Sequence, residues 1–305
     1  MSFSSLARLL FCAAVVCACA HQPWPEPPPV DQRVFLSEHA AWRFKRQQVV
    51  RDNWVGLAGL WLLSERRTAF GTDSALPIVL AGSGPPRVLG TFVRHGQAVY
   101  VAPAAHDLRL TGDNRAIVAP VALQTDNDSV PSELRFGSYR LWIHVVEDRF
   151  YVRARDTANA HLTAFRLPQE YEPNARWRVA ARFNPYKRPR KLRIADIVGV
   201  DEAFSVLGEL VFRVDGRQLR LQTFAEPGDP NLLWLMFGDS TNLRETYGGG
   251  RYLWVPAPDS TGWTVIDFTR SISPPCAYTA YATCALAPPE NRLVARIAAG
   301  EKRVH

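Results

Sequence analysis

Residues 210–224 read Leu-Val-Phe-Arg-Val-Asp-Gly-Arg-Gln-Leu-Arg-Leu-Gln-Thr-Phe, and this stretch decides the fold class. Two runs rich in β-forming residues flank Asp215-Gly216, a dipeptide that suits the tight turn of a hairpin. From 217 to 223, apolar and polar residues alternate, which is the period of a strand with one buried face. The stretch therefore predicts a β-hairpin.

Two other segments have the same pattern. Thr91 to Val101 predicts a hairpin around His95-Gly96, and Leu141 to Val152 predicts one around Glu147-Asp148. No long helical pattern follows residue 51. The sequence therefore predicts a mainly β protein.

One helical pattern precedes the strands, and we expect a packing helix over 31–53. Asp31 can cap its start, and Phe35, Trp42 and Val49 recur on one stripe. Farther along, the polar, Pro-containing segment 169–176 predicts a boundary between two β-rich halves, 54–168 and 169–305.

The N-terminus has the layout of an export signal. Arg8 precedes an apolar run over 9–16 that is too short to span a bilayer, and small residues follow it. The segment 16–19 resembles a bacterial lipobox with Cys19 as the lipid acceptor, whereas 18–20 also fits ordinary cleavage after Ala20. We expect a signal peptide over 1–20, a Pro-rich tether over 21–30, and an extracytoplasmic, membrane-anchored lipoprotein on the periplasmic side of a Gram-negative cell.

The formal charge of +7 raises the question of nucleic acid as a partner. No recognised nucleic-acid-binding motif accompanies the densest basic stretch, and an exported protein meets little nucleic acid. A solvated face or attraction to anionic lipid heads explains the charge. The stretch comprises Arg182, Lys187, Arg188, Arg190, Lys191 and Arg193.

Cysteine and histidine usage limits the chemistry. Cys276 and Cys284 lie outside the signal region, and in an oxidising compartment the expectation is a disulfide between them. No histidine lies between 162 and 304, so a cysteine nucleophile would need a base from the other half, and a local zinc site lacks its imidazoles. His144 alternates with Trp142, which is typical of a packed or surface histidine. Neither a metal nor a cofactor is expected.

The block from 237 to 302 carries the longest set of motifs. It reads Phe237-Gly238-Asp239-Ser240-Thr241, Thr246-Tyr247-Gly248-Gly249-Gly250-Arg251-Tyr252-Leu253, Asp267-Phe268-Thr269-Arg270, Pro274-Pro275-Cys276-Ala277-Tyr278, Tyr281-Ala282-Thr283-Cys284, Pro288-Pro289-Glu290-Asn291-Arg292-Leu293 and Ala299-Gly300-Glu301-Lys302. This succession closely resembles the uncharacterised bacterial and archaeal family DUF1684. The resemblance implies a fold and a site but no reaction.

The resemblance continues upstream, through 54–63, 70–73, 78–80 and 153–156. Thr269 and Ser273 stand where the family usually has asparagines, which implies altered ligand contacts in this member. The half from 54 to 156 also faintly resembles a forkhead-associated β-sandwich. Thr72 replaces the phosphate-binding arginine of that fold, which argues against phosphopeptide binding.

Two functions remain open for the block. A binding or envelope-associated module would hold an anionic or sugar-like small molecule, whereas a hydrolase acting on an envelope component would use Asp267 or Glu301 in acid–base chemistry. Alternatively, Asp267 and Arg251 simply pair with each other. The expected ligand-binding residues are Arg251, Tyr252, Asp267, Arg270, Tyr281 and Asn291.

Overall fold

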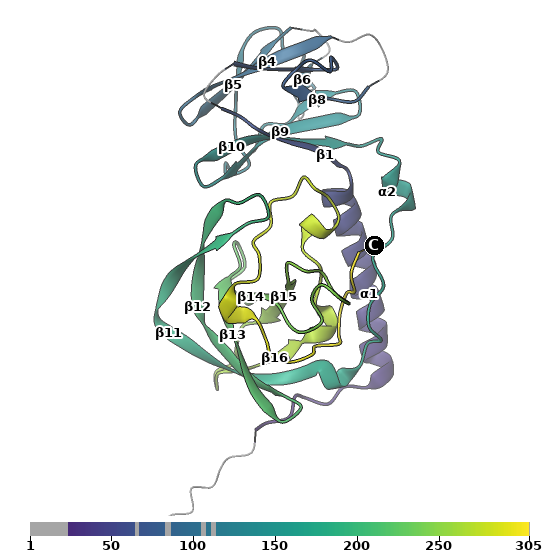
Figure 1. The fold of residues 1–305 in the computed structure, drawn as a ribbon, viewed down its shortest axis with the longest axis vertical. Coiled ribbons are helices and arrows are strands. Elements are labelled where there is room, and N and C mark those ends of the chain that lie inside the picture. The colour runs from purple at the N-terminus through teal and green to yellow at the C-terminus, as the bar shows by residue number, and fades with distance from the viewer. Residues whose placement is uncertain (1–23, 65–66, 83–86, 105–107, 111–113, 305) are drawn as a thin grey trace, which may run out of the picture.

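The computed structural model describes residues 24–64, 67–82, 87–104, 108–110 and 114–304. It is mainly β, with one long N-terminal helix followed by two β-rich halves, so the predicted fold class is confirmed (Figure 1). The predicted signal peptide, Cys19 and the start of the tether lie outside the described residues. Within the described ranges, no helix combines the length and the apolar character that a bilayer span requires.

The helix α1 spans Gln32–Val50, and the carboxylate of Asp31 caps it by accepting from the backbone N–H groups of Arg33 and Val34. Of the predicted stripe, Phe35 is buried, whereas Val49 is 47% exposed. A π-helical turn, η1 (Arg51–Val55), then leads into the first half. In Figure 1, α1 runs along the second half and its C-terminal end reaches the first half.

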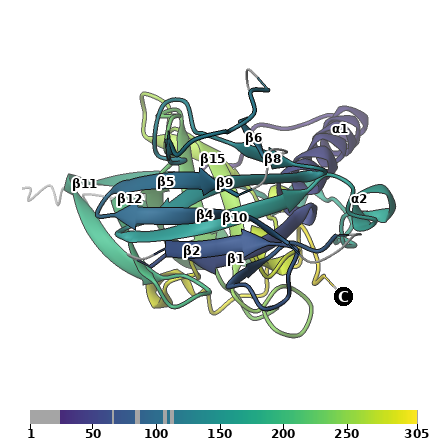
Figure 2. The same ribbon diagram turned by 90° about the horizontal axis from the view of Figure 1, so that it is seen from above.

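The first half is a sandwich of two five-stranded sheets, in the orders β1-β10-β9-β8-β6 and β3-β2-β4-β5-β7. Buried side chains from both sheets, such as Phe70, Phe92, Ile143 and Val152, form one core, so the predicted sandwich is confirmed. Figure 2, seen from above, shows these strands lying over the second half. The strands are β1 (Leu57–Leu62), β2 (Arg67–Gly71), β3 (Ile78–Val79), β4 (Val88–His95), β5 (Ala98–Pro103), β6 (Arg109–Leu110), β7 (Val121–Leu123), β8 (Leu134–Phe136), β9 (Tyr139–Val146) and β10 (Arg149–Asp156).

The second half is a six-stranded antiparallel sheet that curls into a nearly closed barrel, in the order β15-β14-β13-β12-β11-β16. The Thr264 hydroxyl donates to the Pro256 carbonyl at 2.8 Å and joins the two edge strands. The strands are β11 (Arg178–Ala195), β12 (Asp201–Val214), β13 (Arg217–Ala225), β14 (Leu232–Phe237), β15 (Arg251–Pro256) and β16 (Trp263–Asp267).

Short helices join and follow the strands. They are the α-helix α2 (His161–Ala164) and the 3-10 helices η2 (Ala175–Trp177), η3 (Phe268–Arg270), η4 (Pro275–Ala277) and η5 (Pro289–Asn291). The six residues of the basic stretch all lie exposed on β11, as expected of a solvated face.

All three predicted hairpins are confirmed, as β4–β5, β9–β10 and β12–β13. The turn of the third has φ of 48° at Asp215 and 75° at Gly216. A two-residue turn with positive φ at both positions matches the twist of the strands it joins, and it favours residues such as Asp and Gly.

The strand period determines what each face of the barrel sheet presents. On β14, Leu233, Leu235 and Phe237 pack into the main core of the barrel, whereas Trp234 and Met236 belong to a second cluster on the opposite face. This second cluster also includes Trp42 of α1. The opposite face is therefore aromatic, and α1 packs against part of it.

Candidate functional site

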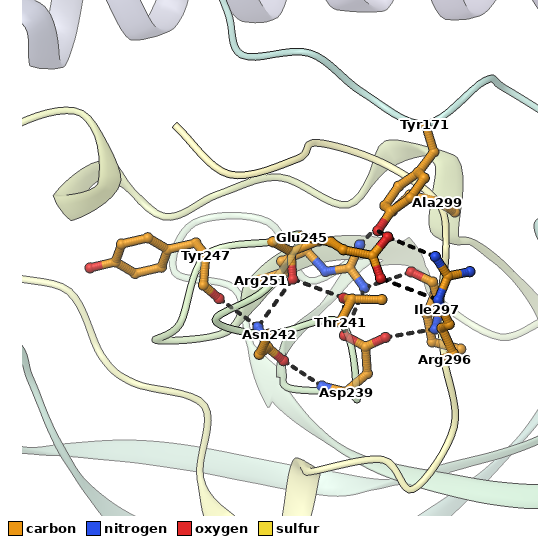
Figure 3. Close-up of polar contacts among 11 residues, drawn as sticks. Tyr171, Asp239, Thr241, Asn242, Glu245, Tyr247, Arg251, Arg296, Ile297 and Ala299 are labelled. Carbon is orange, nitrogen blue, oxygen red and sulfur yellow. Dashed lines mark hydrogen bonds and ion pairs between the residues drawn. The ribbon is translucent and has the colours of Figure 1, made fainter. Parts of the chain in front are cut away.

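Arg251, a predicted ligand-binding residue, is fully buried, and both terminal nitrogens of its guanidinium are bonded to the protein (Figure 3). Its guanidinium donates to Asp239 Oδ1 at 3.1 Å, to the Ile297 carbonyl at 3.0 Å and to the Ala299 carbonyl. Burial lowers the pKa of Arg251, and the charge of Asp239 opposes that shift. The predicted pairing of Arg251 with Asp267 is wrong, because Asp239 is the partner, and the pair stabilises the C-terminal segment against β15.

Asn291, also a predicted ligand-binding residue, is buried and bonded to backbone on all sides. Its Oδ1 accepts from the Gln222 N–H at 2.7 Å, and its Nδ2 donates to the carbonyls of Gln222 and Met236 at 2.9 Å each. Every one of these bonds ties η5 to β13 or β14. Asn291 therefore holds the barrel together and presents no free group to a ligand.

Asp267 is a helix cap and not a free carboxylate. Its Oδ1 accepts from the Thr269 N–H at 3.1 Å and from the Thr269 hydroxyl at 2.5 Å, and its Oδ2 lies 3.7 Å from Arg270 Nε. Thr269, which stands in place of a family asparagine, thus caps η3 together with Asp267. Arg270 extends outward over the ring of Trp42, with its guanidinium carbon 6.0 Å from the ring centroid.

Glu301, the other predicted acid–base group, is only 1% exposed. It accepts from the Ser273 N–H at 2.8 Å and from the Tyr278 hydroxyl at 2.5 Å, and it lies 3.5 Å from Arg46 Nε of α1. Burial and the adjacent Glu301 charge raise the pKa of Tyr278 well above its usual value. Glu301 therefore fastens α1 to the C-terminal segment.

The predicted Cys276–Cys284 disulfide is wrong, because both residues are free cysteines. The Cys276 N–H donates to Cys284 Sγ at 3.1 Å, and the Tyr247 hydroxyl donates to Cys276 Sγ at 3.4 Å. Hydrogen bonds with the Cys284 thiol and the Tyr247 hydroxyl lower the pKa of Cys276, whereas the hydrogen bond with Cys276 and burial raise that of Cys284. Tyr281, 37% exposed, lies in the same loop and makes no side-chain hydrogen bond among the described residues.

A groove with an aromatic floor lies between α1 and the outer face of β14 and β15. It consists of two adjoining cavities of about 460 Å³ and 450 Å³, which share Arg46, Val49, Trp254 and Ile272. Tyr252 and Arg270, two of the predicted ligand-binding residues, line the groove. Arg251, Asp267, Tyr281 and Asn291 are not among its lining residues.

The floor of the groove has an ordered arrangement of rings. Trp234 and Trp254 are opposite each other on β14 and β15, with their planes 8° apart and ring centroids 6.2 Å apart. Tyr252 stands at 90° to Trp234 at 5.0 Å, and Phe204 meets Trp234 edge-on at 5.7 Å. The Tyr252 hydroxyl donates to the Ala285 carbonyl at 2.6 Å, which fixes its ring. The result is a cluster of aromatic rings that hold one another in place.

Charged groups divide between the two ends of the groove. Lys45 and Arg270 line the cavity near Trp42, whereas the carboxylates of Glu202 and Glu226 line the other cavity. Glu226 Oε2 accepts from Trp254 Nε1 at 2.6 Å and holds that ring in place. Trp234 Nε1 is buried with no hydrogen-bond partner among the described residues.

Replacing Glu202 with Gln should change the pH dependence of stability. Burial, and the charges of Glu147 and Asp196, raise the pKa of Glu202, so the folded state binds more protons than the unfolded state above the ordinary value of 4.5. The stability that protonated Glu202 contributes to the wild type is therefore lost as the pH rises from 4.5 through the raised pKa. We expect Glu202→Gln to melt higher than the wild type at about pH 8 and equally at about pH 4. Exposed Glu290→Gln is the control, and an unchanged difference across pH would contradict the assignment.

A larger cavity of about 610 Å³ includes in its lining Glu245, which lies near Arg251 (Figure 3). The other lining residues are Gln169, Arg244, Lys302, Arg303 and Val304. Its carboxylate is already engaged, since Glu245 accepts from Arg296 at 2.7 Å and from the Tyr171 hydroxyl at 2.9 Å. Burial, together with the hydrogen bond to Glu245, raises the pKa of Tyr171 to about 12. With no stacked rings in its lining, this cavity offers a ligand less apolar surface than the groove.

Sequence reasoning missed most of the groove. Trp42 and Arg46 come from α1, and Glu202 and Glu226 come from strand ends far from the motif block. One signal was available, because Trp234 on one strand and Tyr252 and Trp254 on another alternate with apolar residues. Aromatic side chains on the less buried face of paired strands indicate a platform.

Comparisons with known proteins place part of the chain in a family. No curated protein matches the chain. Among solved structures, the solution NMR structure of an uncharacterized protein of Haloarcula marismortui is 28% identical, with 46% of this chain and 78% of that chain covered and a TM-score of 0.39. Residues 163–302 match the family model DUF1684, described as a protein of unknown function. The predicted resemblance to this family is thus confirmed over residues 163–302.

Proposed function

We propose that this protein is an exported, membrane-anchored lipoprotein that binds a sugar-like ligand carrying an acidic group in the aromatic groove. The observation that carries the proposal is the stacked Trp234–Trp254 pair on the groove floor, in which Glu226 holds the ring of Trp254. The apolar C–H face of a pyranose ring stacks on such a surface, and the rigid rings lose little entropy on binding.

The charges of the groove support the orientation of the ligand. Sugar hydroxyls would donate to the carboxylates of Glu202 and Glu226. An acidic substituent would lie at the other end, near Lys45 and Arg270. A pocket that combines an apolar floor with a few polar groups is typical of a small-molecule site.

Export remains part of the proposal and rests on the sequence. The apolar run over 9–16, Cys19 and the Pro-rich segment 21–30 match the layout of a lipoprotein with a tether. The intact mass of the mature protein tests it, because lipidation requires a chain that begins at a diacylglyceryl-modified Cys19. A chain that begins after Ala20 without lipid would contradict the anchor but not the binding site.

Replacing Trp254 with Ala should raise the Kd for an acidic sugar oligomer at least tenfold, or about 1.4 kcal/mol, because it removes half of the stacking surface. Binding is measured by quenching of tryptophan fluorescence during titration with oligogalacturonate. Neutral oligomers of N-acetylglucosamine test the need for the acidic group, and Arg270→Gln should weaken the acidic ligand more than the neutral one.

The matched control is Trp263→Ala. Trp263 is a half-buried tryptophan of the same half, packed against Trp24 at a ring distance of 5.0 Å and absent from the groove lining. We expect this variant to bind as the wild type does. Equal Kd values for Trp254→Ala and the wild type, or no saturable quenching with any oligomer, would refute the groove as the site.

A further inference from the structure

We infer that Thr283, His144 and Asp126 form an acyl-transfer triad at the end of the aromatic groove, with Thr283 as the nucleophile. His144 Nδ1 lies 2.5 Å from Asp126 Oδ2, and His144 Nε2 lies 3.1 Å from Thr283 Oγ1. Thr283 lines the same cavity as Trp234, Trp254 and Glu202. A hydroxyl, an imidazole and a carboxylate in this succession are what nucleophilic catalysis by a hydroxyl requires.

Hydrogen-bond capacity fixes the direction of the proton chain. The Asp126 carboxylate only accepts, so a neutral His144 carries its proton on Nδ1 and leaves Nε2 as an acceptor. The Thr283 hydroxyl therefore donates to Nε2. The Arg153 guanidinium donates to the same Oγ1 at 3.4 Å, and since arginine has no acceptor, the hydroxyl proton is left for His144. This is the tautomer that a general base needs.

The triad is held in place by its surroundings. The side chains of His144 and Asp126 are 13% and 26% exposed. Asp126 Oδ1 accepts from the Val145 N–H at 3.0 Å, and the Asp126 N–H donates to the Ile143 carbonyl at 3.0 Å, so the turn after β7 is bonded to β9 on both sides. Asp126 acts through His144 and is thus a positioning residue. A catalytic triad needs a rigidly held group that orients the imidazole, and Asp126 is held in this way.

Arg153 supplies positive charge next to the nucleophile. It is only 6% exposed, and its Nε is buried without a hydrogen-bond partner among the described residues. Burial lowers its pKa to about 10, so it remains charged at neutral pH. A preorganised cation beside the reacting oxygen stabilises the negative charge that develops during attack.

The substrate class is an ester held in the groove. Thr283 Oγ1 attacks the ester carbonyl carbon as His144 Nε2 takes the hydroxyl proton, and collapse of the intermediate transfers that proton to the leaving alkoxide, which departs as an alcohol. Water then attacks the acyl-threonine as His144 Nε2 takes a proton from it. When the bond between the acyl carbon and Thr283 Oγ1 breaks, His144 returns that proton to Oγ1 and the carboxylic acid leaves. Each step moves one proton and needs no co-reactant other than water.

The experiment uses the full mature chain, with p-nitrophenyl acetate as substrate and a fluorophosphonate as covalent probe. We expect hydrolysis above the buffer rate, and a loss of at least about 100-fold in kcat in both Thr283→Val and His144→Gln. Thr283→Ser should retain activity because it keeps the hydroxyl. Thr279→Val, from the same loop and outside the triad, should behave as the wild type does. Mass spectrometry should place the fluorophosphonate adduct on Thr283.

Two results would overturn the triad: a wild-type rate equal to buffer, or Thr283→Val with wild-type activity and an adduct elsewhere. The adduct on the wild-type protein does not depend on whether a variant folds. The inference rests on the proposed function only for where the ester lies. Hydrolysis of the small ester by the wild type without binding of any oligosaccharide would refute the proposed ligand and leave the triad standing.

Discussion

Replacing Asp239 with Ala should lower the free energy of unfolding by about 3–5 kcal/mol, the cost of leaving a buried charge without its partner. The side chains of Asp239 and Arg251 are both 0% exposed, and they lie 3.1 Å apart. Asp239 Oδ2 also accepts from the Ile297 N–H at 2.6 Å. The substitution therefore leaves the buried guanidinium without its counter-charge and the Ile297 N–H without its acceptor (Figure 3). Urea unfolding followed by tryptophan fluorescence measures the change.

Two further variants help to explain the Asp239→Ala result: one is a control, and the other replaces both members of the ion pair. Ser240→Ala changes an exposed neighbour and should cost less than about 0.5 kcal/mol. Asp239→Leu combined with Arg251→Met removes both charges and should recover part of the loss, because an apolar pair of similar size needs no compensation. A loss below about 1 kcal/mol in Asp239→Ala would show that Arg251 is not held by this pair.

Replacing Glu301 with Ala should lower the free energy of unfolding by about 3 kcal/mol and weaken ligand binding in the groove. Its carboxylate accepts from the Ser273 N–H and the Tyr278 hydroxyl and pairs with Arg46, so three donors lose one acceptor. Arg46 is a wall residue of both cavities of the groove. Without Glu301, Arg46 loses its partner, and α1, which forms one wall of the groove, loses this contact with the C-terminal segment.

The measurement combines urea unfolding with the oligogalacturonate titration. Glu290→Ala, in the exposed start of η5, is the control and should leave both quantities unchanged. Arg46→Met should weaken binding with a smaller loss of stability, because Glu301 keeps two of its three donors. Wild-type affinity in Glu301→Ala would show that the groove does not depend on this anchor.

The local sequence pattern was sufficient to predict the N-terminal helix and the hairpins of the fold. The Asp31 cap, the hairpin at Asp215-Gly216 and the alternation that follows it each depend on a few consecutive residues. Turn chemistry and side-chain period act over that range, which is why they could be predicted. The motif block also indicated the family, since order and spacing are properties of the sequence itself.

The roles of single residues depended on long-range packing. Arg251 could pair with several acids, and it is the pairing of β14 with β15, which sets Phe237 opposite Arg251, that brings Asp239 to it. Asn291 and Glu301 look like free polar groups in the sequence, yet each is buried against backbone or α1. Cys276 and Cys284 are close in sequence, but the loop places them as hydrogen-bonded thiols.

The sequence by itself thus determined the β architecture, the capped helix and the DUF1684 block. Only the tertiary structure decided the two places where chemistry is proposed. The groove requires α1 to lie over β14 and β15, and the triad requires Asp126 and His144 of the first half to meet Thr283 of the second. The physical reason is that period and turn type are local, whereas these contacts arise when distant segments bury a shared surface and satisfy each other's polar groups.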